Sequence, residues 1–73
     1  MPESRRKIVR CELLLEDNTT REMPLEEFEQ LEREKNQDVL ENVICTFEDG
    51  MRFRPYRFAS VGPVELKDGT IIL

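Results

Sequence analysis

The 73-residue sequence lacks histidine and tryptophan, and it has only two cysteines, three glycines and one tyrosine. Without histidine, the chain has neither the commonest general base nor the Ser-His and Cys-His pairs of nucleophilic catalysis. Cys11 and Cys45 have no neighbouring cysteine or histidine to complete a zinc site; we interpret both as buried thiols, with a disulfide or redox pair as the alternative. The glycines are isolated, so none belongs to a phosphate-binding loop. We therefore expect no enzymatic activity and no metal or cofactor.

Long apolar stretches are absent as well. Runs such as Leu13–Leu15 and Ile71–Leu73 are far shorter than the roughly 20 residues that span a bilayer. The basic N-terminus is followed by an alternating pattern and not by the apolar core of a signal peptide. These features predict a cytoplasmic protein without a membrane segment.

The length of the chain predicts one small domain spanning residues 1–73. Apolar residues make up 38% of the sequence, which is typical of a compact folded domain and not of a disordered tail. A domain of this size buries about 60% of its unfolded surface and forms only a thin core. We therefore expect no deep catalytic cavity, and we predict a monomer.

The first half of the chain contains two predicted strands and one predicted helix. From Val9 to Leu15, apolar residues alternate with mostly polar ones, which predicts a strand with Val9, Cys11, Leu13 and Leu15 on one face. A turn then leads into a short strand over residues 20–23.

The predicted helix runs from Pro24 to Lys35, because proline suits the first helical position and acidic residues suit the first turn. Leu25, Phe28 and Leu31 form its core stripe, and Asn36 is a plausible stop. Residues 37–42 are predicted to form a connection that buries Val39 and Leu40.

The second half of the chain contains two predicted hairpins. Asp49-Gly50 lies between the alternating residues 43–47 and residues 51–54, which is a strong hairpin signal. Pro55 places the second of these strands at a sheet edge, with Met51 and Phe53 in the core and Arg52 and Arg54 outside. Residues 64–66 and 71–73 form the other predicted hairpin.

Together these elements predict an α+β fold in which one helix packs on a small, twisted, mostly antiparallel sheet of four to six strands. The expected order is strand, strand, helix, strand, strand, strand.

Charge is unevenly distributed along the sequence. Residues 1–10 carry four basic side chains and one acidic one, whereas residues 11–49 carry thirteen acidic and three basic ones. Residues 50–73 carry four basic and two acidic side chains, and the net charge is −5. Residues 1–7 are predicted to form a mobile basic arm. We interpret the acidic helix as a solvated surface, with nucleic-acid mimicry or docking on a basic partner as the alternative.

The stretch Met51–Phe58 combines arginines with aromatic residues, a composition enriched at the centres of protein interfaces. We therefore predict that the basic arm and this stretch bind a protein partner. The predicted contact residues are Arg5, Arg6, Lys7, Arg10, Arg52, Arg54, Tyr56 and Arg57.

Two other classes of function remain open. A small nucleic-acid-binding domain using the same basic residues would lose affinity steeply with added salt. A structural or oligomer-forming module would pair through the strand near Pro55 or the edge at Ile71–Leu73 and would elute above its monomer mass.

In its general character the whole chain resembles the short phage-encoded proteins that bind bacterial RNA polymerase. The resemblance lies in its length, its eight arginines against three lysines, its acidic body, its basic arm and its lack of catalytic groups. It implies binding to polymerase subunits in the host cytoplasm, with inhibition of initiation, by displacement of the sigma factor, or antitermination as the effect, and no metal or cofactor. It carries no residue role onto a position of this sequence.

Overall fold

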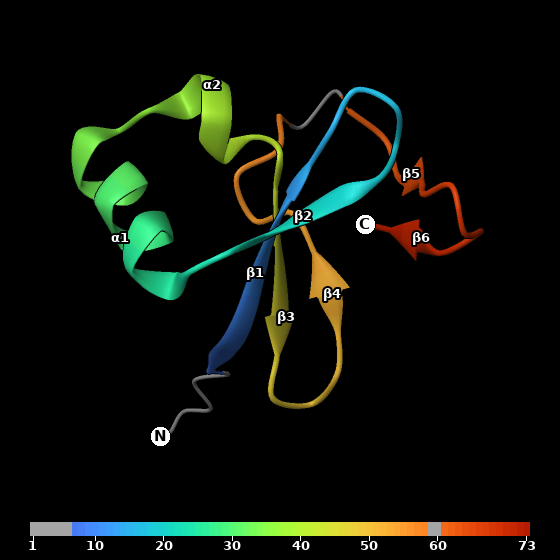
Figure 1. Cartoon of the computed structure of the whole chain (residues 1–73), viewed down its shortest axis with the longest axis horizontal. Helices are drawn as coiled ribbons and strands as arrows, with labels where there is room; N and C mark the ends of the chain where they lie inside the picture. The colour runs from blue at the N-terminus through green and yellow to red at the C-terminus, as the bar shows by residue number, and fades with distance from the viewer. Residues whose placement is uncertain (1–6, 59–60) are drawn as a thin grey trace.

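The computed structural model describes residues 7–58 and 61–73, and most of the predicted basic arm lies outside these residues. Figure 1 shows the elements along the chain. In order they are β1 (Ile8–Leu14), β2 (Thr20–Met23), α1 (Leu25–Glu34), α2 (Gln37–Leu40), β3 (Val43–Phe47), β4 (Arg52–Phe53), β5 (Val64–Glu65) and β6 (Ile71–Ile72). The predicted α+β class is confirmed, and the order of elements agrees approximately with the expected one. Four strands follow the main helix and not three, and the short helix α2 is an addition.

The strands form two antiparallel sheets and not one. The larger has the strand order β2-β1-β3-β4, and β5 pairs with β6 in a separate hairpin. β4 lies at the sheet edge, as Pro55 predicts, because proline has no amide proton for a further ladder bond. The β3–β4 turn contains Gly50 with φ of +89°, a backbone angle that favours glycine.

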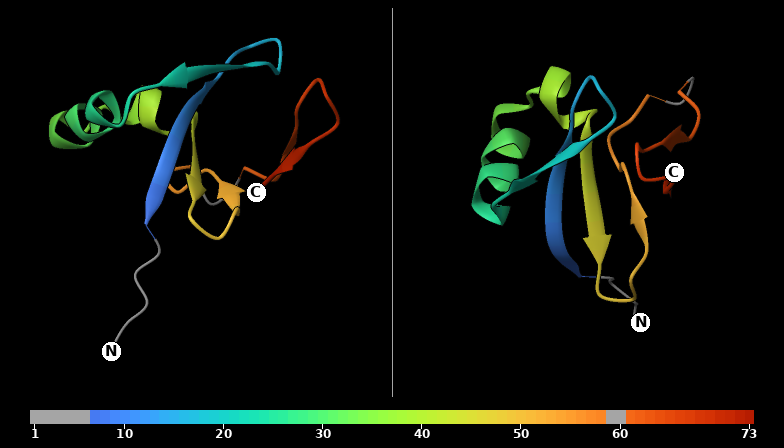
Figure 2. Two further views of the ribbon diagram at one scale, coloured as in Figure 1. Left: turned by 60° about the horizontal axis from the view of Figure 1, so that its bottom comes forward. Right: turned by 45° about the vertical axis from the view of Figure 1, so that its right-hand side comes forward.

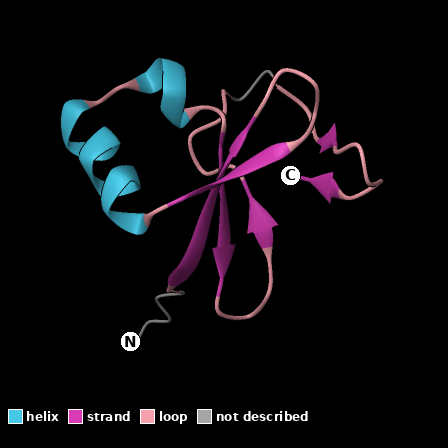
Figure 3. Cartoon of the chain, in the orientation of Figure 1, coloured by secondary structure: helices cyan, strands magenta, loops and turns pink. Residues whose placement is uncertain are grey.

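The sheet is covered on both faces, as Figures 2 and 3 show, with the helices on one side and the β5–β6 hairpin on the other. On the helix side, the buried apolar residues of β1, β2 and β3 pack against Phe28, Leu31 and Leu40. On the opposite side, Ile44 packs against Leu66 and Ile72. Burial of Ile44 therefore depends on the β5–β6 hairpin. The alternating pattern of β3 gave no indication that Ile44 is buried.

Strand β1 departs from the predicted apolar row at both ends. The β1–β3 register shifts between Ile8 and Arg10, so that Ile8, and not Val9, packs on the helix-side core. Val9 is consequently 51% exposed, and Leu15, which follows the end of the strand, is also largely exposed. Cys11 is buried and Leu13 partly buried, as expected.

Helix α1 agrees with the predicted range to within one residue at each end, but two details differ. Lys35, and not Asn36, ends the helix in the left-handed conformation, with φ of 55°, and Asn36 is the N-cap of α2. Leu25 is 41% exposed, because it lines a surface hollow beside Ile8 and Phe28. The connection after the helix buries Leu40 and partly buries Val39, as predicted.

Two more side chains depart from the predicted parity of residues 51–54. Met51 is exposed because it lies in the turn before β4, whereas Phe53 stacks on Phe47 with ring centroids 5.0 Å apart. Arg54, predicted to lie outside, is buried. Its amide donates to the backbone oxygen of Leu73, which joins the end of β4 to residue 73.

The two cysteines face each other across β1 and β3 and are both free, buried thiols, as predicted. A hydrogen bond between the thiols, together with burial, raises the pKa of Cys45. No helix in residues 7–58 and 61–73 has the length and apolar character needed to cross a membrane.

Candidate functional site

The structure divides the predicted contact residues among several places. Arg5 and Arg6 lie outside the described residues. Lys7 is exposed beside the acidic side of α1, where it lines a hollow with Glu29 and Glu32. The remaining five residues form a charged network at Arg10 and Arg52, and a separate surface at residues 54–57.

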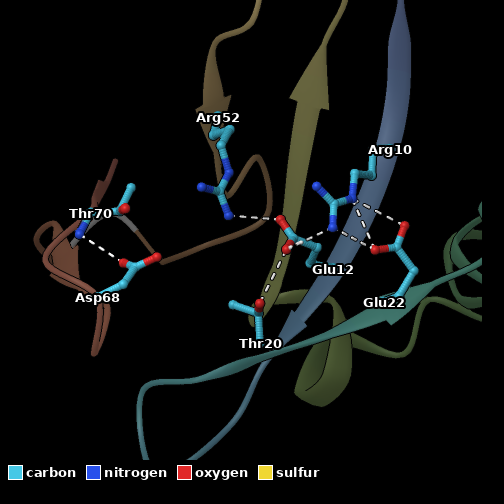
Figure 4. Close-up of polar contacts among 7 residues, drawn as sticks. All are labelled: Arg10, Glu12, Thr20, Glu22, Arg52, Asp68 and Thr70. Atoms are coloured by element: carbon cyan, nitrogen blue, oxygen red, sulfur yellow. Dashed lines mark hydrogen bonds and ion pairs between the residues drawn. The ribbon is translucent and has the colours of Figure 1, made fainter.

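The charged network is centred on Glu12, whose side chain is only 6% exposed. Its carboxylate accepts a hydrogen bond from Arg52 Nη2 at 2.8 Å and another from Thr20 Oγ1 at 3.1 Å (Figure 4). Arg10 lies 3.6 Å away from the same carboxylate and binds Glu22 through Nε and Nη2 at 2.9 and 2.7 Å. Arg10 and Arg52 are therefore both ion-paired within the protein itself.

Asp68 faces this network from the β5–β6 turn (Figure 4). The amide of Thr70 donates to its carboxylate at 3.0 Å. This hydrogen bond lowers the pKa of Asp68, and the nearby positive charge of Arg52 acts in the same direction. Arg52 thus lies between two acidic groups, Glu12 and Asp68.

A second arginine group lies where the chain leaves β4. Arg54 and Arg57 line a shallow hollow of about 160 Å³ with Glu41, Asn42, Phe58 and Val61, and we call this surface the arginine hollow. Arg54 is 6% exposed, and its Nη2 donates to the Gly62 carbonyl oxygen at 3.2 Å. The side chain is buried because β4 ends at Phe53 and the chain returns over it through Gly62.

The two arginines of the hollow have no carboxylate within ion-pair distance among residues 7–58 and 61–73. Arg57 Nη1 instead donates to the Val61 carbonyl oxygen at 2.7 Å. Burial lowers the pKa of Arg54, the charge of Arg57 lowers it further, and Glu41 partly offsets both effects. Arginine stays protonated at neutral pH, so the hollow carries two positive charges against one negative charge.

Apolar side chains border the same surface. Phe58 is 50% exposed and Val61 is 38% exposed, and both line the hollow beside the arginines. An exposed aromatic side chain beside arginine is a combination enriched at protein interfaces. The hollow therefore combines positive charge with apolar surface.

Tyr56 does not line the hollow, and its contacts connect the segment that carries the hollow to the helices. Its hydroxyl donates to Glu32 of α1, and its ring meets Phe28 edge-on at a centroid distance of 6.1 Å. Gln37 of α2 donates to the Tyr56 carbonyl oxygen at 2.9 Å. Through these contacts Tyr56 attaches residues 54–58 to both helices.

The hydrogen bond to Glu32, and to a smaller degree burial, raises the pKa of Tyr56 to about 12, against about 10 for an unfolded chain. The neutral phenol is thus favoured by folding. Its stabilising effect is fully present below pH 10 and is lost as the pH rises through 12. Because Tyr56 is the only tyrosine and tryptophan is absent, ultraviolet titration of tyrosinate observes this residue alone.

We expect a midpoint near 12 in the folded protein and near 10 in denaturant, and Glu32→Gln should bring the folded midpoint down. Glu29→Gln, on the same helix, is the matched control. A folded midpoint equal to that in denaturant would show that the hydrogen bond is absent in solution.

Sequence reasoning identified Arg54 and Arg57 but not the residues opposite them. Glu41 and Asn42 lie in the connection before β3, and nothing in the sequence places them near residue 57. Phe58 could have been predicted as a site residue, because it ends the stretch of arginines and aromatic residues. Among the described residues there is no group of three or more side chains placed to hold a metal ion.

A scan against models of protein families found no match to this chain. Searches of curated proteins and of solved structures also returned no match.

Proposed function

We propose that this protein is a non-enzymatic regulator that binds a protein partner through the arginine hollow. The observation that carries the proposal is the meeting of Arg54 and Arg57, neither paired with a carboxylate among the described residues, with the exposed side chains of Phe58 and Val61. Arginine and aromatic residues in such a setting contribute a large share of binding energy at interfaces.

Charge complementarity identifies the kind of partner segment. The hollow is positive, so an acidic segment with neighbouring apolar side chains fits it. The acidic outer side of α1, which includes the exposed residues Glu26, Glu27 and Glu29, repels such a segment. This polarity orients the encounter so that the hollow meets the partner first.

A bacterial RNA polymerase is the partner that we propose, with the host cytoplasm as the location and control of initiation or termination as the effect. Support comes from the chain's small size, its acidic body and its clustered arginines. The ion pairs of Arg10 and Arg52 reduce the positive charge available to bind free nucleic acid through phosphate contacts. A protein partner therefore fits the charge distribution better than free nucleic acid does.

The test measures binding of the full chain to purified bacterial RNA polymerase, as core enzyme and with sigma factor. Arg57→Ala and Phe58→Ala are each expected to weaken binding by about tenfold or more, because both side chains lie in the contact. The matched controls are Arg21→Ala and Val9→Ala, which remove an exposed arginine and an exposed apolar side chain elsewhere.

Arg54 and Arg52 are not used in this test, because one is buried and the other is paired with Glu12, so their loss also perturbs the fold. Equal binding by the Arg57 and Phe58 variants and the wild type would remove the hollow from the interface. Absence of polymerase binding would remove polymerase as the partner.

A further inference from the structure

We propose that the arginine hollow is a binding site for a single carboxylate group that carries an apolar neighbour, held by Arg54 and Arg57. The inference rests on the proposed function for the source of that group, which is an acidic side chain or the C-terminal carboxylate of the bound protein. The site itself follows from the charges and shape of the hollow.

Arg54 is a buried cation without an ion-pair partner among the described residues. This side chain is 94% buried, its Nη2 donates only to a neutral carbonyl oxygen, and its Nε has no hydrogen-bond partner among the described residues. A buried guanidinium is costly unless an anion compensates its charge. Two residues earlier on the same segment, Arg52 has such an anion, because Glu12 accepts its hydrogen bond at 2.8 Å. Arg54 has no equivalent partner, and a bound carboxylate supplies one.

Arg57 brings a second positive charge to the same hollow. Its hydrogen bond to the Val61 carbonyl oxygen fixes the guanidinium at the rim of the hollow that Arg54 also lines. The two positive charges are close enough for Arg57 to lower the pKa of Arg54, so they repel each other. An anion between them relieves this repulsion, and arginine binds carboxylates through charge-assisted hydrogen bonds.

The net charge and the apolar lining of the hollow determine which oxyanion fits it. Glu41 lines the hollow and leaves it one net positive charge, which suits a singly charged carboxylate better than a phosphate, whose average negative charge at neutral pH exceeds one. The exposed faces of Phe58 and Val61 favour a ligand with an apolar group beside its charge. A carboxylate of an amino acid in a peptide meets both conditions.

The experiment titrates the isotope-labelled full chain with small ligands and follows the Nε–Hε signals of its arginines by NMR. N-acetyl-leucine presents a terminal carboxylate, and N-acetyl-glutamate amide presents a side-chain carboxylate. N-acetyl-leucine amide and N-acetyl-glutamine amide are their neutral counterparts. Inorganic phosphate and sodium chloride complete the set.

We expect at least one carboxylate to shift the Arg54 and Arg57 signals saturably, with a dissociation constant of about 1 mM, as is typical of so small a ligand. The neutral amides should leave both signals unchanged, and phosphate should bind more weakly than the carboxylate. The more effective carboxylate then identifies the source, side chain or C-terminus.

Variants distinguish carboxylate binding in the hollow from a general effect of charge on the arginine signals. Arg57→Gln is expected to weaken carboxylate binding by about fivefold or more, whereas Arg21→Gln should have no effect. Glu41→Gln should tighten binding of both the carboxylate and phosphate by about twofold to fivefold, because it removes the one negative charge in the hollow. Arg54→Lys, checked for folding by its Tyr56 titration, tests the buried arginine.

Shifts produced equally by sodium chloride, or unchanged by Arg57→Gln, would overturn the site. Phosphate binding tighter than carboxylate binding would overturn the proposed ligand class. If the carboxylate binds but polymerase does not, the site stands and the proposed partner is wrong. If polymerase binds through Arg57 and Phe58 but no carboxylate does, the protein interface stands and this site is wrong.

Discussion

Replacing Phe28 by alanine is expected to lower the free energy of unfolding by about 3 to 5 kcal/mol. Phe28 is 3% exposed and packs in the helix-side core with Leu31 and the apolar residues of the sheet. Its ring also meets Tyr56 edge-on, so the substitution removes this aromatic contact as well as the core packing. A domain of this length has a total stability of only about 4 to 11 kcal/mol, so the loss leaves a large fraction of the chain unfolded or close to it.

Chemical denaturation followed by circular dichroism measures this change. Leu25→Ala is the matched control, because it lies one turn earlier on the same helix, is 41% exposed and should cost about 1 kcal/mol or less. The Phe28 variant should also lower the tyrosinate midpoint, since Tyr56 loses its ring contact. Equal destabilisation by the two variants would mean that α1 does not pack on the sheet through Phe28.

The helix-side core was predictable because its signals are local. Residues 25–34 have the spacing of an amphipathic helix, and the alternation in β1 and β3 defines one face of each strand. The exception is Val9, which was predicted to face the core. The β-bulge between Ile8 and Arg10 turns Ile8 toward the core and leaves Val9 exposed. A bulge depends on how β1 aligns with β3, and no pattern within β1 alone reveals that alignment.

The candidate site was less predictable because it depends on contacts between distant residues. The alternation of residues 51–54 predicted an exposed Arg54. In the structure its side chain donates to the carbonyl oxygen of Gly62 and its amide donates to the backbone oxygen of Leu73, and both partners are distant from Arg54 in the sequence. Similarly, Arg10 and Arg52 are two cations in the sequence, but the strand register brings both to Glu12. The sequence alone could have predicted one contact of this network, because Arg10 and Glu12 lie two residues apart on the same face of one strand.

These contacts divide four of the arginines into two pairs, one that forms ion pairs within the protein and one that does not. Arg10 and Arg52 are neutralised by Glu22 and Glu12 and tie three strands of the sheet together. Arg54 and Arg57 form no ion pair with a carboxylate among the described residues, and Glu41 offsets only one of their two charges. The first pair therefore contributes to stability, and the second is the pair from which we expect a contribution to binding.

Replacing Glu12 by alanine tests this division and should lower the free energy of unfolding by about 2 to 4 kcal/mol. The buried carboxylate accepts hydrogen bonds from Arg52 and Thr20, and both donors lose their acceptor in the variant. Arg52 keeps 28% of its side chain exposed, so water can reach part of its guanidinium and the cost stays below that of a fully buried, unpaired charge.

Glu22→Ala is the matched control, because it removes an equally close ion pair at the surface. Glu22 and Arg10 are 60% and 52% exposed, and pairs of this kind contribute about 0 to 1 kcal/mol. Denaturant unfolding of Glu12→Ala, Arg52→Met and the double variant gives the coupling energy of the buried pair directly. A coupling energy near zero, or equal destabilisation by Glu12→Ala and Glu22→Ala, would show that the pair does not stabilise the sheet. Arg52 would then be free to bind a partner, and the interface would have to extend from the arginine hollow onto this face of the sheet.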